Sequence, residues 1–287
     1  IIVLSLEPQE RQEMSNAYLY RTQAGMIFHN EIKLKRKVEK EPTEKRKPKA
    51  NPTRESVINE NNNIATRRLA VLLDANFCEG DSYITLTYKN PSPTQKEAKR
   101  HLHNFIKAMR REYAKQGKPF EWVSVTSHGG HRVHHHMIMK SIDTATIAKH
   151  WTHGLLSISP LAGDDYTPIA RYFINHTRDY YDRETYLNTR RYNCSRNLER
   201  PLTDREHYQH QPGKEIKPKR DCYIIPGSLE VRVNPITGAE HITYREKRFN
   251  EEARRKRRKR KNTITVKPQR FYTVPPGEQL SIPLQYQ

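Results

Sequence analysis

Three consecutive histidines, His134, His135 and His136, are the residues of this 287-residue chain best suited to hold a metal ion. They lie in residues 132–139, whose composition predicts a β-strand. Because alternate side chains of a strand point to the same face, His134 and His136 should project together while His135 projects to the other face. Two neutral imidazoles at this spacing can bind a divalent ion, which could polarise a phosphodiester. The alternative is a histidine cluster without a metal on a solvated strand.

A third ligand depends on the turn of a hairpin. The dipeptide Gly129-Gly130 separates two strand-like stretches and predicts that they pair with each other. With a turn of about three residues, a common hairpin length, His128 would share the face of the two outward histidines. Val123 and Val125 would then face the core on the other side. A two-residue turn would reverse this parity and exclude His128, and Glu121 is a weaker reserve.

Tyr172 is the candidate nucleophile, because a phenolate can attack phosphorus and form a covalent phosphotyrosine. The dipeptide Thr167-Pro168 predicts the start of its helix, with threonine as the cap and proline in the first turn. Tyr180 and Tyr181 follow closely along the chain and are alternatives. An aromatic residue on a helix face is also typical of core packing. The residues expected on one face of this helix are Ile169, Tyr172, Phe173 and His176.

The elements that must position these residues alternate between strand and helix patterns, with a later hairpin. Their order predicts an α+β fold with a central antiparallel sheet and helices on one side, flanked by basic, poorly ordered arms. The expected elements are a helix at 55–74, a strand at 83–88, a helix from 92 to 117, strands at 122–128 and 132–139, a short helix after Asp143, a strand at 155–159, a helix from 167, and a hairpin of 229–233 with 241–244.

The net charge of +20, from 52 Lys and Arg against 32 Asp and Glu, indicates a polyanionic partner. Nucleic acid is favoured, because each neutralised phosphate releases a counterion. A membrane surface would need an amphipathic basic helix or a lipid anchor, and the sequence has neither pattern. An uninterrupted basic run near the C-terminus is the expected phosphate-binding tail. It consists of Arg254, Arg255, Lys256, Arg257, Arg258, Lys259, Arg260 and Lys261.

Cysteine usage and hydropathy suggest the compartment. The three cysteines, Cys78, Cys194 and Cys222, are widely spaced and odd in number, so no disulfide framework is indicated. No apolar run approaches the roughly 18 residues of a membrane-spanning helix. We therefore expect a protein of a reducing cytoplasm.

Three stretches together resemble the HUH endonuclease superfamily. Residues 132–139, Arg-Val-His-His-His-Met-Ile-Met, resemble its second motif, two histidines separated by one residue and followed by apolar strand. Residues 83–88 resemble the first motif, and residues 169–174 resemble the third, the tyrosine helix. The order and spacing agree, and the flanking stretches 76–81 and 192–201 are similar as well. The likeness is to the single-tyrosine rolling-circle replication initiators of phages and plasmids of Gram-positive bacteria.

The resemblance implies a ferredoxin-like or RRM-like sheet, with Mg or Mn held by the histidines. It implies that Tyr172 attacks a phosphate of single-stranded or extruded origin DNA, leaving a 5′-phosphotyrosine and a free 3′-OH. A host polymerase would extend that 3′-OH in the bacterial host cytoplasm, and the tyrosine would later help rejoin the strand. The sequence contains no Walker-type nucleotide-binding loop, so unwinding would need a host helicase.

Two positions depart from the family pattern. Relatives often carry lysine three residues after the tyrosine, where this chain has Asn175, and an acidic residue near Ser127. A non-catalytic DNA-binding replication protein is therefore an alternative, as is a relaxase or transposase of the same superfamily. We expect four regions: a basic N-terminal arm and linker at 1–53, the HUH endonuclease domain at 54–201, a C-terminal extension with a hairpin at 202–250, and a basic tail at 251–287.

Overall fold

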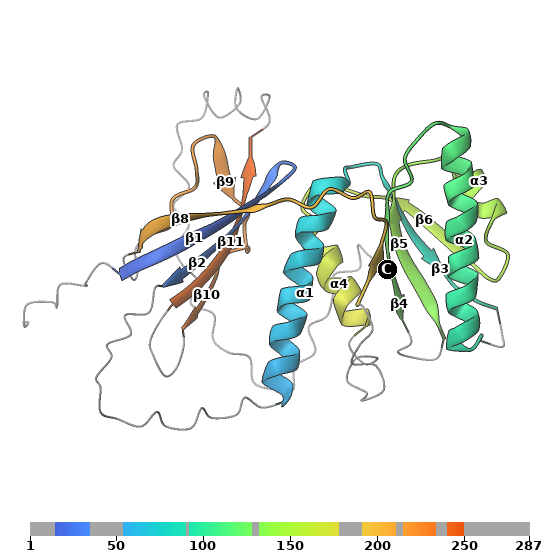
Figure 1. Cartoon of the computed structure of the whole chain (residues 1–287), viewed down its shortest axis with the longest axis horizontal. Coiled ribbons are helices and arrows are strands. Elements are labelled where there is room, and N and C mark those ends of the chain that lie inside the picture. The colour runs from blue at the N-terminus through green and yellow to red at the C-terminus, as the bar shows by residue number, and fades with distance from the viewer. Residues whose placement is uncertain are drawn as a thin grey trace, which may run out of the picture.

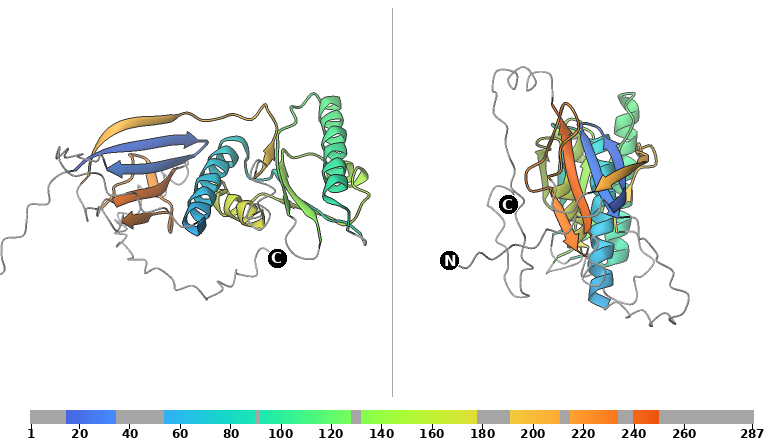
Figure 2. Two further views of the ribbon diagram at one scale, coloured as in Figure 1. Left: turned by 60° about the horizontal axis from the view of Figure 1, so that its bottom comes forward. Right: turned by 90° about the vertical axis from the view of Figure 1, so that its left-hand side faces the viewer.

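The computed structural model describes residues 15–34, 54–89, 92–127, 132–177, 191–210, 215–233 and 240–249. Within these residues the chain forms two antiparallel sheets and four helices. Figure 1 shows them as layers: helices α2 and α3, a five-stranded sheet, helices α1 and α4, and a six-stranded sheet. The two further views in Figure 2 agree that α1 and α4 lie between the sheets.

The five-stranded sheet carries the histidine run near its centre. Its strands follow one another in space in the order β6 (Leu156–Pro160), β3 (Ser82–Leu86), β5 (His134–Met139), β4 (Trp122–Ser127) and β7 (Asn193–Cys194), and all pairings are antiparallel. The helices that cover it are α1 (Arg54–Asn76), α2 (Gln95–Lys115), α3 (Thr144–Lys149) and α4 (Thr167–His176).

Both faces of this sheet are apolar, and each is covered. Met137 and Met139 pack into a core with α2 and α3, whereas Val123, Val125 and Ile138 pack into a second core with α1 and α4. The predicted α+β fold with an antiparallel sheet is therefore confirmed. The helices were expected on one side, but they cover both faces, because each face of β5 presents apolar side chains that must be buried.

Helix α2 shows how local sequence sets these elements. Thr94 caps its first turn in a capping box with Glu97, and the helix ends before Gly117, which has a φ of 65°. Its start therefore lies just beyond the Ser92-Pro93 pair that the sequence indicated. Asp143 caps α3 as expected, through a hydrogen bond from the Thr146 backbone N–H.

The six-stranded sheet lies beyond α1. Its order is β10 (Glu230–Val233), β11 (Glu240–Arg248), β2 (Ile27–Leu34), β1 (Ser15–Ala24) and β8 (Thr203–His210), with β9 (Cys222–Ile224) also paired to β11. The predicted hairpin at 229–244 is confirmed as β10 and β11, but it extends this second sheet and not the central one. Residues 15–34, expected within an arm, form two of its strands.

Polar contacts join the second sheet to the helices. The His29 ring lies 2.7 Å from the buried Asp74 carboxylate of α1, and Arg245 of β11 bonds Asp165 at 3.0 Å just before α4. Gly25, at the β1–β2 turn, has a φ of 56°, and a Cβ there would lie 2.7 Å from the Asp74 carbonyl oxygen. The turn can therefore approach α1 closely only because residue 25 is glycine.

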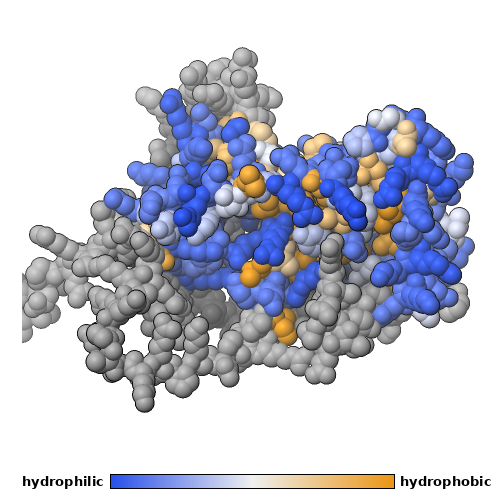
Figure 3. Space-filling model, viewed as in Figure 1, coloured by the Kyte–Doolittle hydropathy of each residue, from blue (hydrophilic) through white to orange (hydrophobic). Residues whose placement is uncertain are grey.

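The surface in the view of Figure 3 is mostly hydrophilic, with hydrophobic residues in small groups. Among the described residues, none of the helices combines the length and apolar composition needed to cross a bilayer. All three cysteines are unpaired, as their spacing predicted.

Candidate active site

The register of β4 against β5 decides which side chains lie beside the histidines. Ser127 pairs with His134 and Val125 pairs with His136, so residues 128–133 form the connection. Cross-strand partners share a face, which places Val125 on the histidine face. The three-residue turn and the parity inferred from it were therefore wrong, because the connection is longer. His128 itself lies outside the described residues.

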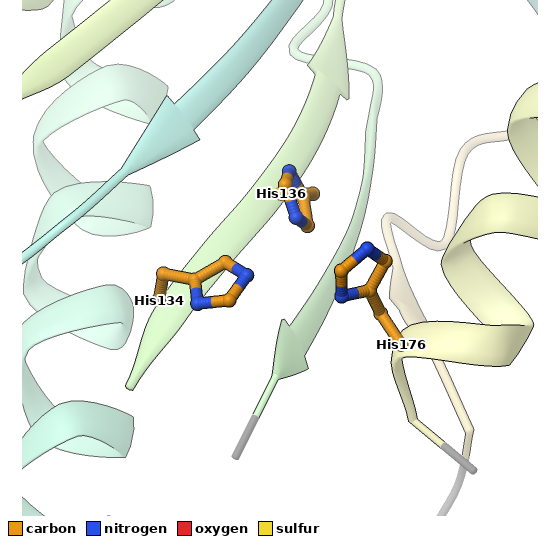
Figure 4. Close-up of side chains that lie close together, drawn as sticks. All are labelled: His134, His136 and His176. Atoms are coloured by element: carbon orange, nitrogen blue, oxygen red, sulfur yellow. The ribbon is translucent and has the colours of Figure 1, made fainter. Parts of the chain in front are cut away.

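Three imidazoles converge on this face. His134 and His136 project from β5 and His176 projects from the end of α4, with the rings turned toward one another (Figure 4). One ligand nitrogen from each ring lies within 4.8 Å of the others, and the His136 ring centroid is 4.9 Å from that of His134 and 5.1 Å from that of His176. This cluster could hold a metal ion. The sequence placed His176 on the Tyr172 face of its helix, but its role as a third ligand was missed.

His136 is at the centre of the cluster and is held by β3. Its Nδ1 lies 3.0 Å from the Tyr83 hydroxyl and 3.2 Å from the Thr85 hydroxyl, and Thr85 is its register partner. Burial, together with the neighbouring His134 and His176, lowers the pKa of His136 to about 3. The ring is therefore neutral near pH 7, which is the form that binds metals. The roles of Tyr83 and Thr85 were not predicted, although both lie in the strand that resembles the first motif.

His134 has a defined tautomer. Its Nδ1 lies 3.1 Å from the carbonyl oxygen of Arg132. A carbonyl can only accept a hydrogen bond, so Nδ1 carries the hydrogen and Nε2 keeps its lone pair for a metal.

His135 lies on the opposite face, as strand alternation predicted. It is completely buried, with its Nε2 at 2.8 Å from the Tyr88 hydroxyl and its Nδ1 at 2.9 Å from the Thr126 hydroxyl. Both ring nitrogens are taken up within the core. His135 therefore has a packing role and does not belong to the cluster.

Tyr172 lies beside the three imidazoles. Its hydroxyl oxygen is 3.4 Å from His136 Nε2, its ring centroid is 4.0 Å from that of His176, and its side chain is 37% exposed. Burial raises the pKa of Tyr172, and a hydrogen bond with Tyr83 partly offsets this. The phenol is thus within reach of the cluster and open to a ligand. Tyr180 and Tyr181 lie outside the described residues.

Helix α4 sets the position of both Tyr172 and His176. Pro168 lies in its first turn, as predicted, but the cap position is Tyr166 and not Thr167. The Asp165 carboxylate accepts a hydrogen bond from the Thr167 backbone N–H at 3.1 Å. Four residues separate Tyr172 from His176, so both side chains lie on the same helix face.

The donor set suits a divalent transition ion. Three neutral imidazole nitrogens favour ions such as Mn²⁺, whereas Mg²⁺ prefers an oxygen shell. The hydrogen bonds to the far nitrogens of His134 and His136 are the contacts that orient metal-binding histidines. The residues present therefore fit a metal.

Two further positions concern the family pattern. Asn175 is exposed on α4, and Ser127 is buried opposite His134. The expected phosphate-binding tail lies outside the described residues: Arg254, Arg255, Lys256, Arg257, Arg258, Lys259, Arg260 and Lys261.

Comparison with known proteins gives one match. No curated protein and no solved structure matches the chain significantly. Residues 81–182, about a third of the chain, match a family model of replication-associated proteins of the ORF2 type. The match spans β3 to α4 and includes the three clustered histidines, Tyr83 and Tyr172. In the part of the chain that carries the histidine cluster, the protein is thus similar to replication-associated proteins.

Proposed function

We propose that the protein is a replication initiator endonuclease, which nicks and rejoins single-stranded DNA at a rolling-circle origin through a 5′-phosphotyrosine. The observation that carries the proposal is the Tyr172 hydroxyl at 3.4 Å from His136 Nε2, inside a cluster of three imidazoles. A phenol beside a candidate metal site has the reach needed to attack a phosphate held there. The similarity to replication-associated proteins supports DNA as the substrate.

The nicking step exchanges one phosphodiester for another. The Tyr172 oxygen forms a bond to phosphorus while the bond from phosphorus to the 3′ oxygen of the preceding nucleotide breaks. The phenol proton passes to solvent, and a solvent proton completes the free 3′-OH. Because the phosphotyrosine conserves the bond energy, attack by a 3′-OH reverses the step and rejoins the strand.

His134, His136 and His176 would hold the metal, and Tyr83 and Thr85 would orient His136. A divalent ion bound there would polarise the scissile phosphodiester and stabilise the charge that develops on it. Of the two expected ions, Mn²⁺ fits the nitrogen donors better than Mg²⁺. His128 stays a candidate ligand that the described residues do not include.

The products determine the partners. A free 3′-OH is a primer, so a host polymerase would extend it, and a host helicase would separate the strands. We place this reaction in the bacterial host cytoplasm, with the basic run at 254–261 as a further phosphate contact.

The test uses a pool of random-sequence single strands, because it requires no knowledge of the origin. The full chain is incubated with the pool and Mn²⁺, and denaturant-resistant protein–DNA adducts are collected and sequenced. We expect adducts that share a sequence and disappear with chelator or in the double variant His134→Ala, His136→Ala. His103→Ala, an exposed histidine of α2, is the matched control and should keep them. No adduct from the wild type would overturn the proposal.

A non-catalytic DNA-binding replication protein is the second candidate. Asn175 favours it, because the neutral amide replaces the lysine that relatives carry near the reacting phosphate. This candidate predicts DNA binding that is unchanged in the double histidine variant, with no adduct under any metal.

A further inference from the structure

Aromatic and cationic side chains alternate on one face of the six-stranded sheet, outside the range that matches the family model. Tyr18 of β1 pairs in register with Lys33 of β2 and His207 of β8, which forms one row across three strands. In the next row Tyr20 pairs with Arg205. Because cross-strand partners and alternate residues share a face, these five side chains lie on the same side of the sheet. We call them the tyrosine face.

The tyrosine face is not the core side of its sheet. Leu19, which lies between the two tyrosines along β1, points the other way and packs with Ile32, Ile242 and Tyr244 into the buried core of this sheet. Tyr18 and Tyr20 are only partly buried, and Lys33, Arg205 and His207 are exposed. The rings are therefore accessible to a ligand.

The cations on this face hold the rings in place. The Arg205 guanidinium lies 4.8 Å from the Tyr18 ring centroid, and the Lys33 ammonium lies 5.0 Å from that of Tyr20. The His207 ring is 4.8 Å from the Tyr18 ring, centroid to centroid. These contacts order the aromatic groups before a ligand binds, which lowers the entropic cost of binding.

One acidic residue shares the second row, and its charge is already taken up. Glu31 contacts Arg67 at 2.8 Å, His241 at 2.6 Å and Lys33 at 3.1 Å. Burial alone would raise the pKa of Glu31, but hydrogen bonds from His241 and Lys33 and the charge of Arg67 lower it to about 2. Arg205 has no acidic partner within the same row of β1 and β8, so the face keeps positive charge on that side.

We propose that the tyrosine face binds single-stranded DNA, with bases stacked on Tyr18 and Tyr20 and phosphates held by Lys33, Arg205 and His207. Aromatic rings interleaved with cations on an exposed sheet suit an unpaired strand, because only unpaired bases can lie flat on the rings. A duplex would offer its phosphates but keep its bases stacked. The choice of DNA rests on the proposed function, whereas the surface lies on a separate sheet from the histidine cluster (Figure 1).

Binding of a fluorescent oligo(dT) strand, measured by anisotropy, tests the face without any nicking. The full chain carries Tyr172→Phe, and chelator is present, so catalysis cannot contribute. We expect the double variant Tyr18→Ala, Tyr20→Ala to bind at least about tenfold more weakly, and Tyr18→Phe, Tyr20→Phe to bind within about twofold of the parent, because phenyl rings still stack. Equal loss in the phenylalanine pair would overturn base stacking.

A second pair of variants covers the case in which the alanine variant fails to fold. Lys33→Gln with Arg205→Gln changes only exposed side chains and should flatten the salt dependence of binding by about 0.7 per lost phosphate contact. Lys99→Gln with Lys107→Gln, on the exposed side of α2, removes the same charge and should have a smaller effect. Equal losses in both pairs, or equal loss for a duplex, would overturn the tyrosine face as a single-strand site. Adduct formation is scored separately, so failure of nicking leaves this result intact.

Discussion

The hydroxyl of Tyr172 and Nε2 of His136 lie 3.4 Å apart, although 36 residues separate them in the sequence. The contact joins the two parts of the proposed chemistry, a nucleophile on α4 and a metal ligand on β5. It arises because α4 packs against the same face of the sheet on which alternate residues of β5 project. Each prediction below changes one part of this arrangement.

Changing the third imidazole tests the composition of the metal site. We expect His176→Ala to lower Mn²⁺ affinity by more than about tenfold, because one of three nitrogen ligands is lost. His128→Ala is the matched comparison and should bind Mn²⁺ as the wild type does. Electron paramagnetic resonance of free Mn²⁺ measures both. A large loss in His128→Ala with none in His176→Ala would restore the ligand set inferred from hairpin parity.

Removing the Tyr83 hydroxyl tests the orientation of His136. Tyr83→Phe deletes the 3.0 Å contact to Nδ1 but keeps the ring, so the fold should persist while Mn²⁺ affinity falls by about tenfold. Tyr223→Phe, on β9, is the control. Unchanged affinity in Tyr83→Phe would show that Thr85 alone holds the imidazole.

Acid should destabilise the metal-free protein through His136. The pKa of this histidine falls from 6.5 to about 3 on folding, chiefly because of burial. Between these values the unfolded chain takes up a proton that the folded chain does not, so the free energy of unfolding decreases as the pH falls from 6.5 toward 3. One such group contributes at most about 1.4 kcal/mol per pH unit. Urea unfolding at several pH values should show a shallower dependence in His136→Gln, and an identical dependence would contradict the shift.

Deleting residues 254–261 tests the basic run. We expect weaker DNA binding and a flatter dependence on salt, because fewer counterions are released from the DNA. Anisotropy at a series of salt concentrations measures the slope. An unchanged slope would show that the run does not contact phosphates.

Much of the central sheet could be predicted from local sequence. The apolar spacing from Leu102 to Tyr113 predicted α2, and Asp143 predicted the start of α3. The alternation of the histidine run predicted that His135 turns away, and the Tyr88 and Thr126 contacts agree. These features depend on periodicity and capping, which are properties of neighbouring residues.

The rest depends on contacts between distant segments. The register of Ser127 with His134 is set by the length of the connection, which the Gly129-Gly130 pair did not reveal. β1 pairs with β8, so Tyr18 meets a residue far along the chain, and no local pattern indicated the second sheet. His176 was placed on the correct helix face, but its approach to His136 depends on how α4 packs.

The most direct test of the central claim maps the residue that carries the DNA. The adduct formed with Mn²⁺ is digested with nuclease and protease, and mass spectrometry locates the nucleotide-bearing tyrosine. The proposal predicts a 5′-linked nucleotide on Tyr172, and no adduct from a folded Tyr172→Phe protein that still binds Mn²⁺ and single-stranded DNA. An adduct on Tyr83, Tyr180 or Tyr181, or one that persists in Tyr172→Phe, would contradict Tyr172 as the nucleophile.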